Sequence, residues 1–161
     1  IGDKGQITVI SQPGLRYAQA EALVNSLLLD AAFNNLSLTA RNNVLERILS
    51  EIKGRMMEDI VLLETMLANP KKEVFKLQFA VGEIDMVVFD PEALSCKIYE
   101  IKHSTEIAEQ QYRYLVDTDK CKDIEFRFGT ITERTVIYRG ENANLENGVK
   151  YQNVEEYLSI L

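Results

Sequence analysis

The sequence predicts a mixed α/β fold in which helices flank a central mixed sheet. Apolar residues recur at three- and four-residue steps up to about residue 67 and then at every second position from residue 73. Three of the alternating segments follow one another after short turns, which is the spacing of a β-meander. A helical segment separates the third strand from a fourth, so the fourth is expected to pair parallel with an earlier strand.

Two helices are predicted before the sheet. A turn at Pro13–Gly14 precedes a first helix over residues 16–32. Thr39 is expected to cap a long second helix over residues 40–67, which Asn69-Pro70 ends. The second half of this helix is apolar on most sides, so we expect it to be buried from several directions.

The rest of the chain is predicted to supply the sheet and its remaining helices. Strands are expected at residues 73–79, 83–90, 97–102, 124–128 and 135–138. Ser104 or Thr105 is expected to cap a helix through Leu115, residues 140–150 to form a loop, and residues 154–161 a final helix. The aromatic residues with strand spacing are expected in the core: Phe75, Phe79, Phe89, Phe126, Phe128 and Tyr138.

Composition bounds the class of protein. A chain of 161 residues, 46% hydrophobic and 27% charged, is typical of one globular domain with a helical appendage. Cys96 and Cys121 lack metal-ligand spacing, which predicts reduced thiols and a cytoplasmic location. No apolar run is long enough for a transmembrane helix, so no membrane is expected as a partner. The net charge of −7 argues against tight independent binding to nucleic acid.

Four ionisable residues stand out in the predicted elements. Glu58 lies in the apolar half of the long helix, Asp85 in the second strand, and Glu100 and Lys102 in the third. Side chains two positions apart on a strand share a face, so Glu100 and Lys102 point the same way. Because neighbouring strands of a meander are paired, we expect Asp85 beside Glu100.

This set of residues suits a divalent cation. Crowded carboxylates repel one another unless a cation lies between them. Mg²⁺ is usually held by one or two carboxylates together with waters and substrate phosphate. Asp85, Glu100 and the carbonyl of Ile101 are the predicted ligands of Mg²⁺ or Mn²⁺, and Glu58 is expected to bind a metal-ligated water or a second ion. Lys102 is expected to hold an attacking water or to stabilise charge on a phosphate.

These motifs resemble those of the PD-(D/E)XK nuclease superfamily. The segments GEID (82–85) and EIK (100–102) match the family's central motif, with Ile84 in place of the proline. Gly54-x-x-x-Glu58 is similar to the family's helical glutamate, and Gln110-x-x-x-Tyr114 to a motif that RecB-type branches place after the third strand. The resemblance covers roughly residues 40–130 and implies a restriction-endonuclease-like αβββαβ core. It also implies catalytic roles for Gln110 and Tyr114.

The whole chain resembles the C-terminal domain of certain prokaryotic AAA-type ATPases. The resemblance lies in QPGLRY (12–17), LERILSEIKGRMMEDIVLLE (45–64) and GEIDMVVFD…YEIKHS. It implies that residues 1–38 are the tail of a preceding domain plus a helix, and that residues 39–161 are a nuclease-like domain. The partner would then be an ATPase module of the same longer chain, since this sequence contains no phosphate-binding loop.

Two functions stay open at this level. The first is a Mg²⁺- or Mn²⁺-dependent phosphodiesterase that acts on nucleic acid. The second is a catalytically inactive nuclease fold that serves as an interaction or regulatory domain of the ATPase, which the acidic charge and the N-terminal helices favour. The helix faces within residues 16–50 also suit pairing between copies of the chain.

Each candidate residue also has an ordinary structural interpretation. Glu100 and Lys102 would form a solvated ion pair on an edge strand, worth at most about 1 kcal/mol. Asp85 would face solvent beside Glu83, and Glu58 would be a surface charge on its helix. The pair Gln110 and Tyr114 would reflect ordinary packing, His103 would be structural, and the basic cluster would be solvated: Lys71, Lys72 and Lys76.

Overall fold

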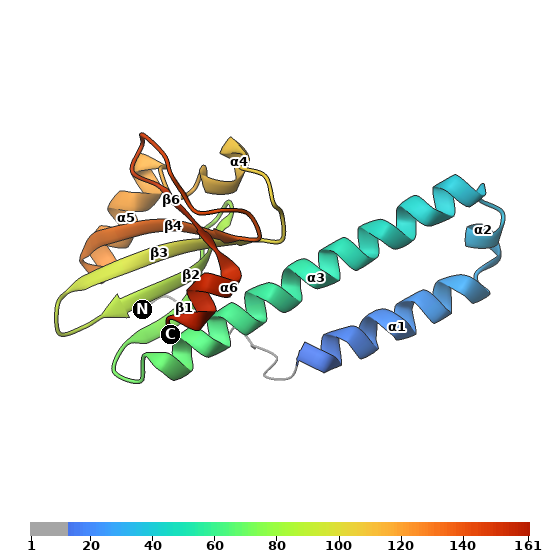
Figure 1. Ribbon diagram of the computed structural model, residues 1–161, viewed down its shortest axis with the longest axis horizontal. Coiled ribbons are helices and arrows are strands. Elements are labelled where there is room, and N and C mark those ends of the chain that lie inside the picture. The colour runs from blue at the N-terminus through green and yellow to red at the C-terminus, as the bar shows by residue number, and fades with distance from the viewer. Residues whose placement is uncertain (1–12) are drawn as a thin grey trace.

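A computed structural model of the chain describes residues 13–161, which form a six-stranded mixed sheet flanked by helices (Figure 1). The first twelve residues, part of the predicted N-terminal tail, lie outside the described residues. The helices are α1 (Pro13–Leu29), α2 (Ala31–Asn34), α3 (Leu38–Ala68), α4 (Glu109–Tyr112), α5 (Thr118–Phe128) and α6 (Val154–Ser159). The strands are β1 (Glu73–Gln78), β2 (Glu83–Asp90), β3 (Ser95–Lys102), β4 (Thr130–Tyr138), β5 (Ala143–Asn144) and β6 (Lys150–Asn153).

The sheet combines the predicted meander with a parallel crossover. Its strand order is β1-β2-β3-β4-β6-β5. The β1–β2 and β2–β3 pairs are antiparallel, and β4 lies parallel to β3 because the chain crosses over through α4 and α5. Strand β6 is parallel to β4, and the short β5 closes the far edge. The expectation of a central mixed sheet is therefore confirmed.

Helices cover both faces of this sheet, so the central strand β3 is buried on its two sides. One core packs under α5 and includes Ile84, Val87, Ile98, Ile124 and Val136. The other packs under α3 and α6 and includes Val61, Met86, Tyr99, Ile137 and Tyr157. Strand β3 contributes to both cores and is hydrogen-bonded on both edges, to β2 and β4.

Helix α3 leaves the sheet and forms a helical arm with α1 (Figure 1). All buried residues of α3 lie in its second half, from Met57 onward. Helix α1 runs beside α3, and Arg16 near the start of α1 forms an ion pair with Asp59 in the second half of α3. Ser37, rather than the predicted Thr39, caps α3 by accepting a hydrogen bond from the backbone of Ala40. Helix α3 thus belongs both to the arm and to the layer of helices that covers the sheet. The predicted domain boundary between residues 38 and 39 stays a prediction.

The predicted strand at residues 124–128 is wrong, because this segment forms the second half of α5. The Asp117 side chain caps the helix by accepting from the backbone N–H groups of Asp119 and Lys120. Cys121 and Ile124 are buried three residues apart on one helix face. Phe126, predicted to be in the core, is 90% exposed. The alternation in IEFRF therefore reflects a helix with one exposed aromatic residue.

Other predicted boundaries shift. Pro13 and Gly14 begin α1 rather than forming a turn, in line with the preference of proline for the first helical position. The helix expected from residue 104 to Leu115 is reduced to the four residues of α4. The last predicted strand is longer and begins at Thr130. Within residues 13–161, no helix has both the length and the apolar character that crossing a bilayer requires.

Candidate functional site

The candidate site lies where β2 and β3 separate. Their pairing ends at Met86 and Tyr99, and Asp85 and Glu100 are the first residues beyond it. The backbone N–H of Ile101 donates to Oδ2 of Asp85 at 2.8 Å, so a carboxylate replaces the missing strand partner. Asp85 and Glu100 are only 4% and 3% exposed. The interpretations as an edge-strand ion pair and as a solvent-facing aspartate are therefore wrong.

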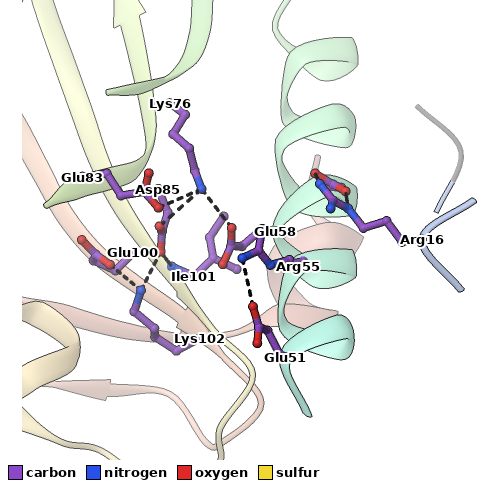
Figure 2. Close-up of polar contacts among 11 residues, drawn as sticks. Arg16, Glu51, Arg55, Glu58, Lys76, Glu83, Asp85, Glu100, Ile101 and Lys102 are labelled. Atoms are coloured by element: carbon purple, nitrogen blue, oxygen red, sulfur yellow. Dashed lines mark hydrogen bonds and ion pairs between the residues drawn. The ribbon is translucent and has the colours of Figure 1, made fainter. Parts of the chain in front are cut away.

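Lys102 bridges the two buried carboxylates (Figure 2). Its Nζ lies 2.7 Å from Oδ2 of Asp85 and 2.6 Å from Oε2 of Glu100. Burial opposes the charge on Lys102, but Asp85 and Glu100 together raise its pKa, so the ammonium stays protonated. Burial and the neighbouring Asp85 raise the pKa of Glu100 to about 8 although Lys102 opposes them. Asp85, Glu100 and Lys102, which the sequence predicts to lie close together, are therefore joined through the ammonium of Lys102.

Lys76 of β1 forms a second ammonium bridge that the sequence reasoning missed. Its Nζ lies 3.0 Å from Oε2 of Glu58, 3.1 Å from Oε1 of Glu83 and 3.9 Å from Oδ1 of Asp85 (Figure 2). The β1–β2 register shifts between Phe75 and Leu77, and such irregularities re-aim side chains. The side chain is 17% exposed, so the expectation of a solvated lysine is wrong.

A signal for Lys76 does exist in the sequence. Lys76 alternates with Val74 on β1, and Val74 packs with the core under α3. A lysine on a strand face that meets a helix needs an acidic partner there, and Glu58 is the one in reach.

Glu58 reaches the site through Lys76. Its carboxylate is 28% exposed and forms an ion pair with Lys76. Burial and the charge of Asp85 raise the pKa of Glu58, while Lys76 lowers it. At Gly54, one turn earlier, an added Cβ would lie 3.9 Å from Cβ of His103, an ordinary contact. Helix α3 therefore places Glu58 beside the strands, with Lys76 between it and Asp85, and a role for Glu58 at a metal stays a prediction.

The structure does not bring Gln110 and Tyr114 into the site. Gln110 is exposed, and Tyr114 lies beyond the end of α4 with its ring against Gly82 and Lys120. The neighbouring Gln111 faces the site instead, donating to Oγ of Ser104 at 2.9 Å and accepting from Oη of Tyr151 at 3.0 Å. Because α4 is only four residues long, Gln110 and Tyr114 do not lie one turn apart on a helix.

An open pocket of about 460 Å³ reaches Glu58, Lys76, Glu83 and Lys102, whereas the buried Asp85 and Glu100 are not among its lining residues. It is formed by the middle of α3, by β1 and the start of β2, and by the end of β3, and it is lined by Ser50, Glu51, Gly54, Arg55, Glu58, Lys76, Glu83, Ile101, Lys102, His103, Ser104 and Gln111. Nε2 of His103, one of the lining residues, lies 3.3 Å from Nη1 of Arg139. The lining therefore mixes carboxylates with cationic side chains: Glu51, Glu58 and Glu83 with Arg55, Lys76 and Lys102.

The oxygen donors gathered here are of the kind that divalent cations bind. Oε1 of Glu100 is buried and has no hydrogen-bond partner. Four carboxyl groups (Glu58, Glu83, Asp85 and Glu100) face the two ammoniums of Lys76 and Lys102, so the charge is −2 once an entering ion has displaced the proton of Glu100. All the acceptors are oxygens, which Mg²⁺ and Mn²⁺ prefer.

The side chains as arranged do not yet form a coordination shell. In the described part of the chain, no three His, Cys, Asp or Glu side chains converge on a point that could hold an ion. The reason is visible in Figure 2, where the two lysine ammoniums lie between the carboxylates. A metal would have to displace at least one lysine contact.

No family model, curated protein or solved structure matches this chain. Its function therefore has to be inferred from the geometry of the site.

Proposed function

We propose that this chain is a PD-(D/E)XK-like phosphodiesterase domain that uses Mg²⁺ or Mn²⁺ to cleave nucleic acid. The single observation that carries the proposal is the meeting of Asp85, Glu100 and Lys102 where β2 and β3 separate, with Oε1 of Glu100 left buried and unpartnered. A buried acceptor without a partner costs free energy, so its retention favours a ligand. The order α3, β1, β2, β3, crossover helix, β4 supports the family proposal.

The residues divide the chemistry among them. Asp85 and Glu100, with the carbonyl of Ile101, are the groups that would hold the ion. When bound, such an ion polarises a phosphodiester and lowers the pKa of a bound water. Lys102 neutralises the carboxylates in the resting site, and we assign its ammonium to the attacking water or to charge that develops on the phosphate.

The acidic character of the chain limits what it does alone. A net charge of −7 repels a polyanion, so a divalent ion or a partner has to supply the attraction. We propose that the partner is an AAA-type ATPase module of the same longer chain, which would deliver the nucleic acid.

The test is cleavage of labelled single- and double-stranded DNA and RNA with Mn²⁺. Wild type is expected to cleave at least one substrate, and Lys102→Ala to lose about 10²-fold or more of the rate. Lys97→Ala is the matched control, since Lys97 lies on the same strand but pairs with Glu133 away from the site. Equal cleavage by wild type and Lys102→Ala would contradict the assignment.

The helical arm favours a second candidate, a non-catalytic interaction domain. The arm exposes large apolar side chains, among them Leu23, Leu28, Leu29 and Leu38. Exposed apolar groups of this kind mark contact surfaces, either for the ATPase or for a second copy of the chain. This candidate predicts that Lys102→Ala leaves regulation of the ATPase unchanged, whereas the phosphodiesterase predicts that function is lost.

A further inference from the structure

The number of cations that the site accepts can be inferred from its second lysine. Phosphodiester-cleaving sites use either one ion or a pair of ions that clamp the attacking and leaving oxygens. We propose that Lys76 takes the place of a second metal ion, so that the site binds a single divalent cation at Asp85 and Glu100. This inference rests on the proposed metal-dependent function and adds to it a specific role for Lys76.

The contacts of Lys76 are those expected of a cation shared between carboxylates. Its Nζ lies within 3.1 Å of one oxygen each of Glu58 and Glu83, and 3.9 Å from Oδ1 of Asp85. Lys102 contacts Oδ2 of Asp85, so the two ammoniums lie on different oxygens of one aspartate. Asp85 therefore bridges two cationic positions, which the ammoniums of Lys76 and Lys102 occupy.

The two lysines differ in how easily a metal ion can displace their ammonium groups. The Lys102 side chain is 31% exposed and contacts Glu100, whose other oxygen is buried and unpartnered. The Lys76 side chain is 17% exposed and is enclosed by Glu58 and Glu83 at the β1 irregularity. An ion that enters between Asp85 and Glu100 has to displace Lys102, which contacts both carboxylates, whereas Lys76 contacts Glu58 and Glu83 and can stay in place.

A retained Lys76 excludes a second ion for two reasons. It fills the space between Glu58 and Asp85 that a second ion would need. Its positive charge also repels a divalent cation, and this repulsion is stronger in a partly buried site than in water. Removing the ammonium while keeping the length of the side chain should open that position.

The experiment counts Mn²⁺ ions bound to the metal-free chain. Isothermal titration calorimetry with MnCl₂ gives the stoichiometry, and electron paramagnetic resonance detects spin coupling between neighbouring Mn²⁺ ions. Wild type is expected to bind one ion. Lys76→Met is expected to bind two, the second more weakly and with spin coupling. Lys72→Met, a neighbouring lysine that pairs loosely with Asp90, is the matched control and should bind one.

Further variants keep the test decisive. Adding Glu58→Gln to Lys76→Met should return the stoichiometry to one, because Glu58 would be a ligand of the second ion. Lys76→Gln replaces Lys76→Met if circular dichroism shows that the latter does not fold. Two ions bound to wild type, or one bound to folded Lys76→Met and Lys76→Gln, would overturn the role of Lys76. Wild type that binds no Mn²⁺ would overturn the proposed function as well.

Discussion

At the scale of single residues, Glu100 is the most unusual group in the molecule. Its carboxyl group is buried beside Asp85, and one of its oxygens has no partner. Burial and Asp85 raise its pKa to about 8, which means that the folded chain resists ionising it. Functional sites commonly retain such unfavourable groups at the expense of stability.

The raised pKa predicts how stability depends on pH in metal-free buffer. Between the ordinary carboxyl pKa and about 8, the folded chain holds a proton on Glu100 that the unfolded chain releases. The free energy of unfolding therefore falls as pH rises through this window. Glu100→Gln removes that loss. The free energy of unfolding of this variant should therefore equal that of wild type near pH 4 and exceed it by about 1–3 kcal/mol near pH 8.5. Urea unfolding at both pH values measures the difference.

Glu133 provides the control for this prediction. Its pKa is lowered, because Lys97, Thr135 and Lys150 together outweigh its burial. Its contribution is therefore present above the ordinary carboxyl pKa and lost as pH falls, so Glu133→Gln should be less stable than wild type at high pH. A Glu100→Gln variant that is destabilised at pH 8.5 would contradict the assigned pKa direction.

At the scale of elements, the sequence predicts best where periodicity is long. Strands β1 to β3 and helix α3 follow from sustained two-residue and three- to four-residue patterns. The segment 124–128 differs from its prediction because five alternating residues fit either a strand or the exposed and buried sides of a helix. The helix is indicated instead by Asp117, a capping residue that lies outside this five-residue segment.

The cap at Asp117 can be tested directly. Asp117→Ala removes the acceptor for the N–H groups of Asp119 and Lys120 and should cost about 0.5–2 kcal/mol of stability. Asp123→Ala, which breaks only an exposed ion pair with Arg127 on the same helix, should cost about 0.3–0.5 kcal/mol. Thermal unfolding distinguishes them, and equal effects would argue against a capped helix here.

Part of the site could be predicted because it lies on elements with long periodic patterns. Asp85, Glu100 and Lys102 follow from strand alternation and the adjacency of a meander, and Glu58 from the helix that covers the sheet. Alternation along β1 places Lys76 on the face toward α3, but its contacts with Glu83 and Asp85 accompany a register shift between β1 and β2 that the sequence pattern does not show. Gln111 faces the site where Gln110 was predicted to do so, because α4 is one short turn. The Gln111 side chain is oriented by its hydrogen bonds with Ser104 and Tyr151.

At the scale of the whole molecule, charge and shape set the conditions for binding. The chain carries a net charge of −7, and its helical arm projects beyond the sheet from α3 (Figure 1). An acidic domain gains little from counterion release, so contact with nucleic acid depends on a bridging ion or on a partner module.

Binding of DNA by the isolated chain should therefore require a divalent cation. Fluorescence anisotropy with a labelled oligonucleotide should show weak binding in EDTA and a clear gain in Ca²⁺. Asp85→Asn should lose the gain, whereas Asp90→Asn, at the other end of β2, should keep it. Equal binding in EDTA and Ca²⁺ would indicate that the ion plays no part in recognition.

The central claim is that Asp85 and Glu100 hold a metal ion, and crystals soaked in Mn²⁺ test it most directly. Anomalous scattering should place one Mn²⁺ between the two carboxylates, with Lys102 withdrawn from at least one of them and Lys76 still on Glu58. A map without an anomalous peak there, and with Lys102 still bridging Asp85 and Glu100, would contradict the account.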